Sequence, residues 1–541
     1  MQFEIKGMNC DHCARTIEKT LDADGIIEKN VSYREAGALI SFDPTKISGD
    51  AIKQMIDGTG HYKVSGSSEI AESGSNDQHL IIIGGGSAAF AAAIEASARR
   101  AKVTMINDGL PIGGTCVNVG CVPSKNLIRA AEALHKTNHN PFAGMQSQGK
   151  LISFKELIRQ KRDLVFELQE QKYINVIKDM DQFRLIEGRA KLLSSNSVEV
   201  NGETIRGSHV LLATGARPFI PDIPGLKDVP YLTNESAFEL EQLPESVIVL
   251  GGRYIALEIA QMFARLGSKV TLLQRSQRIL PSETADLTDA LSGYLRDEGI
   301  NIETGNYFQR VNQNNGQIVV QSMINNEKRT FSAEKIIVAA GRQANTDNMG
   351  LAEVGVALNA NGFVKTDKYQ QTSVSGIYAA GDVLGENMFV YTAAYEGNLA
   401  ASNMFNPVKK EKDYMALPWV VFTDPQVAGV GLDEKQANEK KIDYDVSVVH
   451  MNDVPRALAA HNTRGFIKLL RNKANDQLIG ARMVASEGSE MLMEIALAIR
   501  YRIPVKELKQ MFHPYLTLSE AVKIALIAFD KDVKKLSCCA V

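Results

Sequence analysis

HLIIIGGGSAAFAAAIEASARRAKVTMIND, residues 79–108, decides the fold of the largest part of this chain. An apolar strand turns at Gly84 and Gly86, and a helix with Ala89 in the third small position leads to a second strand at Val103–Ile106. This order of strand, glycine turn, helix and strand begins a dinucleotide-binding βαβ unit, whose turn lets the backbone approach a pyrophosphate. The stretch therefore predicts a parallel α/β sheet that binds a nucleotide.

A second unit of the same kind follows in SVIVLGGRYIALEIAQMFARLGSKVTLLQRSQR, residues 246–278. Gly251 and Ala256 stand at two of the small positions, whereas Arg253 replaces the second glycine. That replacement predicts a looser or rearranged contact with the pyrophosphate. Two units in the same context are strong evidence, so the chain holds two nucleotides, or one nucleotide and the relic of a second site.

The residues after the second strand of each unit indicate which nucleotide binds there. In the second unit Gln274 stands where an acid would hold a ribose 2'-hydroxyl, and Arg275 and Arg278 follow it. This pattern favours the 2'-phosphate of NADPH over NADH. In the first unit Asn107 and Asp108 stand at the corresponding place, and either can bond the ribose.

Length and composition indicate a globular protein of several domains. The 541 residues correspond to about three or four domains. With 60 Lys and Arg against 63 Asp and Glu, the net charge of -3 creates no field for nucleic acid or an anionic membrane. The N-terminus lacks the apolar core of a signal peptide, and no stretch has the roughly 18 apolar residues of a membrane span. We therefore expect a cytoplasmic protein that binds neither nucleic acid nor membranes.

The six cysteines form three close pairs: Cys10 with Cys13, Cys116 with Cys121, and Cys538 with Cys539. In a reducing cytosol, paired cysteines bind metal or carry out redox chemistry more often than they form structural disulfides. The adjacent cysteines of the last pair have Cα atoms about 3.8 Å apart, below the usual disulfide range of about 4.4 to 6.8 Å. They suit a dithiol that binds a soft metal ion.

The middle pair has the features of a redox couple. Pro123 suits the first turn of a helix, which places Cys121 at the N-terminal end, where the helix dipole stabilises a thiolate. Cys116 is then the outer thiol that exchanges with other thiols.

Residues 1–65 predict a small separate domain with alternating strands and helices. The predicted strands are Gln2–Gly7, Ile26–Tyr33, Ala38–Phe42 and Tyr62–Val64, and the predicted helices are Cys10–Leu21 and Ser48–Ile56. This βαββαβ order is that of a ferredoxin-like sandwich. Residues 66–78, rich in Ser, Gly and acids, predict a flexible linker.

The motif GGTCVNVGCVPSK, which contains Cys116 and Cys121, resembles the redox motif of the pyridine nucleotide-disulfide oxidoreductases, such as glutathione reductase, lipoamide dehydrogenase and mercuric reductase. The resemblance runs from His79 to the C-terminus, through ATGARP, AAGR and TSVSGIYAAGD. It implies FAD in the first unit, NADPH in the second, and a homodimer. The implied α/β fold has two Rossmann-like domains, an FAD domain at 79–225 and 346–413 and an NADPH domain at 226–345, and an α+β dimerisation domain at 414–541 that ends in a metal-binding tail.

The resemblance also implies roles for single residues. Asp382 bonds the ribityl chain of FAD, Lys125 lies near the flavin N5 with Glu258 as its partner, and Tyr254 covers the flavin face where the nicotinamide must stack. The remaining residues of the implied FAD site are Gly109, Thr115, Ala190 and Val390.

The C-terminal segment separates members of the family. Disulfide reductases of this type carry a His-Pro-Thr segment whose His is the acid and base for the thiols. Aligning TLSE of FHPYLTLSE puts Tyr515 in the place of that His, and His513 lies two positions earlier. Tyr515 together with the terminal dithiol resembles the mercuric reductases, and GMNCDHC at the N-terminus resembles the heavy-metal-associated domain.

These resemblances imply an NADPH-dependent flavoprotein that reduces thiol-bound Hg(II) to elemental mercury. Hg(II) is a soft ion that exchanges between thiolates, and all three cysteine pairs are the expected metal ligands. Two alternatives remain. One is a lipoamide- or glutathione-type disulfide reductase, if His513 reaches the position of the base. The other is a soft-metal binding module whose flavoprotein part resets its thiols.

Overall fold

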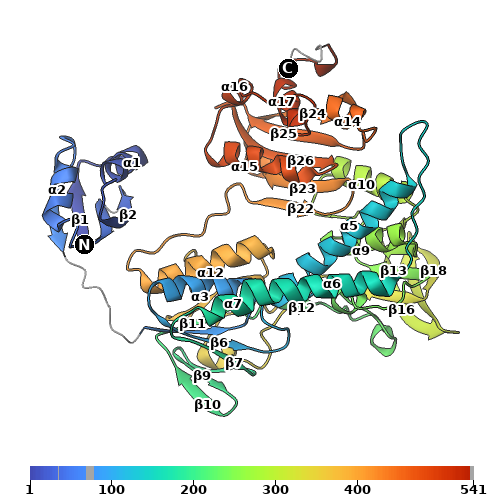
Figure 1. The fold of residues 1–541 in the computed structure, drawn as a ribbon, viewed down its shortest axis with the longest axis horizontal. Coiled ribbons are helices and arrows are strands. Elements are labelled where there is room, and N and C mark those ends of the chain that lie inside the picture. Colours follow the sequence, from blue (N-terminus) through green and yellow to red (C-terminus); the bar gives the residue numbers. More distant parts are fainter. Residues whose placement is uncertain (34–35, 69–77, 536–541) are drawn as a thin grey trace.

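The computed structural model describes residues 1–33, 36–68 and 78–535, which form an N-terminal module, two α/β units and a C-terminal antiparallel sheet covered by helices (Figure 1). This arrangement confirms the predicted fold class. Within the described ranges, no helix is both long and apolar enough to cross a membrane.

The N-terminal module has the predicted βαββαβ order. Its elements are β1 (Gln2–Lys6), α1 (Asp11–Thr20), β2 (Ile26–Ser32), β3 (Gly37–Phe42), α2 (Gly49–Asp57) and β4 (Lys63–Ser68). The sheet has the order β2-β3-β1-β4 and is antiparallel. Both helices pack on it around the fully buried Phe3, Ile17 and Ile52.

The structure corrects the predicted start of the linker at residue 66. Residues 66–68 pair with residues 2–4 of β1 as the end of β4. Their small and polar side chains suggest a linker by composition, but their backbone groups complete the ladder along the edge of β1. Residues 69–77 of the predicted linker lie outside the described residues.

The first α/β unit has a parallel sheet of order β21-β11-β5-β6-β7. Its strands are β5 (His79–Ile83), β6 (Lys102–Asn107), β7 (Phe183–Glu187), β11 (His209–Leu212) and β21 (Ile377–Ala379). Leu80, Ile81 and Ile82 are fully buried, because helices cover both faces of such a sheet. The covering helices include α3 (Ser87–Ala98) and α12 (Val390–Phe405), which pack against each other.

A long helical region joins this unit to the second one. It contains α4 (Gly114–Asn118), α5 (Cys121–Asn138), α6 (Phe154–Gln169), the π-helical turn η1 (Glu170–Ile174) and α7 (Asn175–Lys178). α5 packs against α6 and against α9 (Tyr254–Leu266) of the second unit. The helix that begins at Cys121 is therefore in direct contact with the second dinucleotide unit.

The second α/β unit repeats the parallel arrangement with the order β15-β14-β13-β19. Its elements are β13 (Ser246–Leu250), α9, β14 (Lys269–Leu273), α10 (Ala285–Asp297), β15 (Asn301–Glu303) and β19 (Lys335–Val338). An antiparallel sheet of β16 (Tyr307–Asn314), β17 (Gln317–Ile324) and β18 (Glu327–Ala333) packs beside it.

The C-terminal part is an antiparallel sheet of order β22-β23-β26-β25-β24. The strands are β22 (Pro418–Val421), β23 (Gln426–Gly431), β24 (Tyr444–His450), β25 (Phe466–Asn472) and β26 (Gln477–Ala485). The helices α15 (Leu492–Arg500), α16 (Val505–Leu508) and α17 (Glu520–Ile527) share its buried core. As Figure 1 shows, β22 is the strand of this sheet nearest to the two α/β units.

Short elements complete the fold. They are β8 (Lys191–Ser194), β9 (Ser197–Val200), β10 (Glu203–Arg206), β12 (Ala216–Pro218), η2 (Leu226–Asp228), α8 (Asn234–Ala237), β20 (Arg342–Ala344), α11 (Leu351–Val354), η3 (Asp382–Leu384), α13 (Glu434–Glu439), η4 (Met451–Asp453), α14 (Pro455–Ala459), η5 (Gly488–Met491) and η6 (Val533–Lys535). β12 pairs with β20, so the segment by which the chain enters the second α/β unit lies beside the segment by which it leaves.

Candidate active site

A cavity of about 700 Å³ lies at the carboxyl ends of β5, β6 and β11. Eleven of the residues that the sequence indicates line it: Gly84, Gly86, Asn107, Asp108, Gly109, Thr115, Cys116, Cys121, Ala190, Asp382 and Val390. Residues from six separate segments thus meet at one site, as expected for the ligand-binding edge of a parallel sheet. Both Asn107 and Asp108 line the cavity.

The cavity wall has the glycine turn and the polar group expected of a site for FAD. Gly84 has a φ of +123°, and a Cβ atom there would lie 2.1 Å from the carbonyl oxygen of Ala213, so only glycine fits this turn. The Thr214 hydroxyl in the wall is buried and has no hydrogen-bond partner among the described residues. A buried hydroxyl without a partner is costly, so this wall favours an occupant with polar atoms.

Asp382 is held by two residues that the sequence analysis did not select. Arg342 Nε lies 3.5 Å from the Asp382 carboxylate, and Arg342 Nη2 donates to Thr115 Oγ1 at 3.3 Å. Burial raises the pKa of Asp382, and the charge of Arg342 opposes that rise. The buried Glu396 accepts a 2.7 Å hydrogen bond from the Gly381 backbone, which fixes the turn that carries Asp382. Arg342 lies in the AAGR motif, whereas no sequence signal marks Glu396.

The turn that carries the two cysteines of the cavity is held rigidly. Asn118 Nδ2 donates to three backbone carbonyls, those of Pro111, Ile112 and Gly114, at 2.9 to 3.3 Å. Asn234, from the entry to the second unit, donates to the carbonyl of Val119 at 2.9 Å. Cys121 is the first residue of α5, as the sequence predicts.

The two thiols have opposite protonation tendencies. The hydrogen bond from Cys116 lowers the pKa of Cys121 to about 7; burial opposes this shift, and the charge of Lys125 assists it. The same hydrogen bond, together with burial, raises the pKa of Cys116. Cys121 is therefore the thiolate of the pair near neutral pH, and Cys116 is the thiol.

Lys125 lies one turn after Cys121 on α5 and is fixed from two sides. Its Nζ lies 2.8 Å from Glu258 Oε2 on α9 and 4.5 Å from the centre of the Phe422 ring. The Phe422 backbone N–H donates to the other oxygen of Glu258 at 3.0 Å. Lys125 lies outside the set of cavity-lining residues, so its charge acts on Cys121 from behind the cavity wall.

Lys125→Gln should slow alkylation of the reduced enzyme by iodoacetamide near pH 7. The variant loses a positive charge and leaves the buried Glu258 charge unbalanced, so the pKa of Cys121 should rise from about 7 by about one unit or more. Because the thiolate is populated only above its pKa, the alkylation profile should shift to higher pH.

Lys136→Gln is the matched control for this measurement. Lys136 also lies on α5 but pairs with Glu132, three turns farther along the helix. An unshifted profile in Lys125→Gln, or an equal shift in Lys136→Gln, would contradict the assigned role of Lys125.

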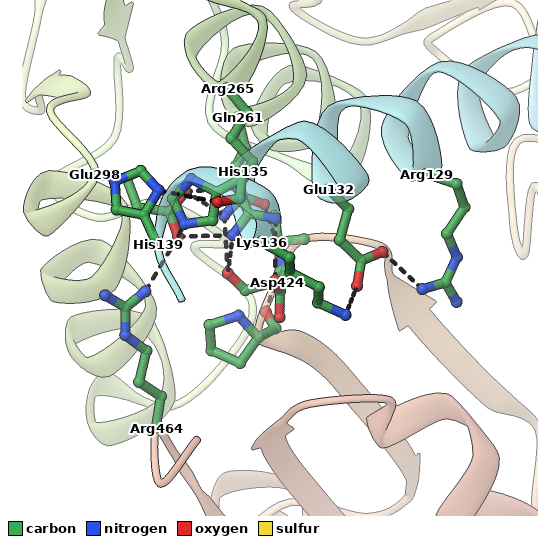
Figure 2. A network of polar contacts seen from close by, with 12 residues as sticks. Arg129, Glu132, His135, Lys136, His139, Gln261, Arg265, Glu298, Asp424 and Arg464 are labelled. Carbon is green, nitrogen blue, oxygen red and sulfur yellow. Dashed lines mark hydrogen bonds and ion pairs between the residues drawn. The ribbon is translucent and has the colours of Figure 1, made fainter. Parts of the chain in front are cut away.

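A buried network of charges ties α9 to the end of α10 and to the C-terminal sheet, and α5 packs beside it (Figure 2). Arg265 on α9 binds Glu298 at 2.7 Å and Asp424 at 3.0 Å, and both Arg265 and Glu298 are almost fully buried. His135 of α5 lies 3.9 Å from the same Glu298 oxygen. Burial lowers the pKa of His135 to about 4, so it is neutral at physiological pH and contributes packing rather than charge.

The second glycine turn lies at the start of α9, as the sequence predicts. Gly251 is followed by Arg253, which has an extended backbone with a φ of -108°, so this position does not require glycine. Gln274 at the end of β14 packs against Gly252, and Arg275 and Arg278 are exposed on the loop after it. Ala256 and Ala89, the third small residues of the two units, are fully buried.

Tyr254, the first residue of α9, does not line the cavity, but its ring stacks on Phe389, which lies between the lining residues Met388 and Val390. Burial raises its pKa to about 12, and the charge of Glu283 adds to that rise. The phenol therefore stays neutral under physiological conditions.

Tyr515 and His513 differ in exposure and in their contacts within the C-terminal segment. His513 Nε2 lies 2.8 Å from Glu494 Oε1, and its side chain is almost fully buried. The Tyr515 side chain is half exposed, and Leu516 after it adopts a φ of +62° while its backbone donates to Glu520 at 3.1 Å. The Tyr515 side chain therefore lies at the surface of the loop, whereas the His513 side chain is held inside by Glu494.

The N-terminal cysteines form a second thiol site. Their sulfur atoms are 3.6 Å apart at the start of α1. The backbone of Asn9 and the hydroxyl of Tyr62 lower the pKa of Cys13 to about 7. In the described ranges no group of three or more His, Cys, Asp or Glu residues could hold a metal ion, so these thiols act as pairs. Cys538 and Cys539 lie outside the described residues.

Family models match the chain in three places. The pyridine nucleotide-disulphide oxidoreductase model matches residues 78–397, its dimerisation domain matches residues 417–526, and the heavy-metal-associated domain matches residues 2–61. A solved structure, the HOCl-induced flavoprotein disulfide reductase RclA from Escherichia coli, superposes with a TM-score of 0.75 at 28% identity, over 83% of this chain and 99% of that one.

Curated relatives match over the full length. The mercuric reductase of Staphylococcus aureus is 39% identical over 100% of this chain and 99% of its own, and that of Acidithiobacillus ferrooxidans is 40% identical over 100% and 98%. FAD and NADPH are the cofactors of this fold, and the geometry of the first cavity fits FAD. The chain belongs to the pyridine nucleotide-disulphide oxidoreductase family, in its mercuric reductase branch.

Proposed function

We propose that this enzyme reduces thiol-bound Hg(II) with NADPH, in the reaction Hg(SR)₂ + NADPH + H⁺ → Hg⁰ + NADP⁺ + 2 RSH. The observation that carries the proposal is a reactive cysteine pair combined with the position of His513, which lies two residues before the place of the base and has a side chain that is almost fully buried against Glu494. A disulfide reductase needs a histidine that reaches its thiols as their base, whereas ligand exchange on a metal ion needs only thiolates.

The chemistry that FAD supplies when bound is the transfer of two electrons from NADPH to the substrate. The chain itself provides the thiolates that bind the substrate metal. We assign the first attack on Hg(II) to Cys121, which is exposed and is the thiolate of the pair near pH 7, instead of to Cys116, the exchanging thiol of the sequence prediction. Cys116 then loses its proton as it replaces the second ligand of the metal.

Tyr515 fits a role as a proton donor to a thiolate. An ordinary tyrosine has a pKa of about 10, so it holds its proton at neutral pH, donates a hydrogen bond and does not act as a base. Because this residue is half exposed on a loop of the C-terminal part, we assign it to the active site of a second subunit.

The other two cysteine pairs bind the metal ion in turn before it reaches the inner pair. We propose that Cys10 and Cys13 capture Hg(II), since one of them has a pKa of about 7 and both lie at the start of α1. Cys538 and Cys539 would receive the ion and pass it to the inner pair. Each step replaces one thiolate ligand by another, so no thiol is oxidised.

We propose that the enzyme is a homodimer that works in the reducing cytoplasm. The match to the dimerisation domain supports the dimer. So do the large exposed apolar side chains on α15, at its C-terminal cap and in the loop before α17: Met493, Leu497, Tyr501, Met511, Phe512 and Leu516. A reducing compartment keeps the cysteine pairs available as thiols.

The enzyme should release mercury vapour when it is mixed with NADPH and Hg(II) in excess thiol. One NADPH should be consumed for each mercury atom released, because both changes involve two electrons. The vapour is measured by atomic absorption, and NADPH by its absorbance.

Two other outcomes would identify the alternatives. NADPH consumption with lipoamide or glutathione disulfide, and none with Hg(II), would identify a disulfide reductase. Stoichiometric Hg(II) binding without vapour would identify a metal-binding module.

A further inference from the structure

Four aromatic rings form a stack that joins three parts of the molecule. The stack consists of Trp419 on β22, Tyr254 at the start of α9, Phe389 before α12, and Tyr391 in its first turn. The ring centres of successive members are 5.8, 6.1 and 5.3 Å apart, and their planes differ by 8°, 16° and 5°. We call these four residues the aromatic stack.

The Trp419 end of the stack is fixed by its surroundings. Trp419 pairs with Gly429 across the β22–β23 ladder, where a Cβ atom would lie 2.6 Å from the indole, so glycine makes room for the ring. The Arg482 guanidinium lies 5.5 Å from the indole centre on that side. Arg482 is buried and bonded to Glu283 at 2.8 Å, which prevents it from moving away.

The other end of the stack is tied to the same strand. The Tyr391 hydroxyl donates a 2.6 Å hydrogen bond to the carbonyl oxygen of Pro418, the residue before Trp419. Both ends of the stack are therefore anchored to β22. Tyr254 lies between two rings that are themselves held in place.

We propose that Trp419 is a positioning residue that holds Tyr254 in its resting place and so limits the entry of the nicotinamide. This inference rests on the proposed function with NADPH and on the role that the family resemblance implies for Tyr254: Tyr254 covers the flavin face where the nicotinamide must stack, so it must move when NADPH binds. Stacked aromatic pairs are stabilised beyond the area they bury. NADPH must therefore overcome the loss of the Trp419–Tyr254 contact, which lowers its apparent affinity.

Replacing Trp419 should make the coenzyme bind more readily. In Trp419→Leu, the NADPH concentration that gives half the maximal rate of anaerobic flavin reduction should fall by about 2- to 10-fold. Trp419→Phe keeps a smaller ring and should give an intermediate value. If Trp419 contributed to packing alone, the half-maximal NADPH concentration should instead rise in Trp419→Leu, because a loosened fold binds coenzyme less well.

The neighbouring Val420 provides the matched control. It lies on the same strand but points to the opposite face, against the core of the C-terminal sheet. Val420→Ala should leave the half-maximal NADPH concentration unchanged. FAD content, measured for every variant, shows which of them are folded.

A spectroscopic measurement tests the contact itself. Trp419 is the only tryptophan of the chain, so tryptophan fluorescence, excited at a wavelength that tyrosine does not absorb, reports on this position alone. Saturating NADP⁺ should change the emission as Tyr254 leaves the indole, and the change should be absent in Tyr254→Ala. Emission that does not respond to NADP⁺, or a half-maximal concentration that rises in Trp419→Leu, would overturn the proposal.

Failure of the proposed function would look different. Flavin reduction is measured without Hg(II), so an enzyme that releases no mercury vapour still yields these results. If Tyr254→Ala leaves flavin reduction by NADPH unchanged, Tyr254 does not control the entry of the nicotinamide. The proposed role of Trp419 is then refuted as well. If Tyr254→Ala alters flavin reduction but Trp419→Leu does not, only the role of Trp419 is refuted.

Discussion

Two inactive variants of this enzyme should restore activity when they are combined in one dimer. The first variant, Cys116→Ala with Cys121→Ala, lacks the inner pair but keeps the tail. The second, Cys538→Ala with Cys539→Ala, keeps the inner pair but lacks the tail cysteines. As homodimers, both should reduce thiol-bound Hg(II) about 100-fold more slowly than the wild type, or worse, because a complete site needs both pairs.

The heterodimer should recover about half of the wild-type activity per dimer. In a closed two-fold dimer each interface residue has a symmetry mate, so a tail that reaches across the axis serves the partner's site. The intact tail of the first chain then meets the intact inner pair of the second, which restores one of the two sites. Differently tagged chains, co-expressed and purified over both tags, give the heterodimer for a mercury vapour assay.

A heterodimer of the tail variant with a chain lacking all four cysteines is the control. It has one intact inner pair and no tail, so it should stay inactive. If each tail served its own chain, the two double variants would also recover nothing together. That result would also count against Tyr515 acting at the site of the other subunit, since it lies on the same C-terminal part.

The parts of the site that the sequence predicts are those with local signals. The glycine turn at Gly84 and the start of α5 at Cys121 depend on neighbours within a few residues, so the motif contains the geometry. Glu258 was predicted only through the family, because its contact with Lys125 joins residues 133 positions apart. The types of two residues do not show that they are in contact when they lie so far apart in the sequence.

Other contacts have no signal in the sequence. Glu396 and Trp419 are ordinary members of a helix and a strand by pattern, and only the fold shows that one supports the turn of Asp382 and the other stacks on Tyr254. The start of the linker was wrong for a related reason. Composition describes side chains, whereas the end of β4 is held by its backbone.

The contacts between α5 and α9 explain how the redox cysteines are held in a fixed position relative to the nicotinamide unit. α5 carries Cys121 at one end and His135 near the other, and α9 carries Tyr254, Glu258 and Arg265 along the face toward it. The Lys125–Glu258 ion pair at one end of this contact and the packing of the neutral His135 beside Glu298 at the other fix the redox pair relative to the nicotinamide unit. Removing one partner of a buried pair leaves an unbalanced charge, so this geometry is strongly enforced.

Neutralising both Arg275 and Arg278 should remove most of the preference for NADPH. Each charge-assisted contact with a phosphate stabilises a complex by about 1.5 to 3 kcal/mol, or about 10- to 100-fold in affinity. Arg275→Gln with Arg278→Gln should therefore lower kcat/KM for NADPH by at least about 10-fold and change that for NADH little.

The structure supports this expectation, and steady-state kinetics with both coenzymes tests it. Both arginines are exposed on the loop after β14, and neither forms an ion pair within the described residues, so both charges are available to a ligand. The loop itself is fixed, since the Leu280 backbone donates to the carbonyl of Gly252 in the glycine turn at 2.8 Å. Arg310→Gln, an exposed arginine on β16 of the same unit, separates a local contact from a general effect of charge. An equal loss of kcat/KM with NADPH and NADH would show that the two arginines contact a part common to both coenzymes, because only the 2'-phosphate distinguishes them.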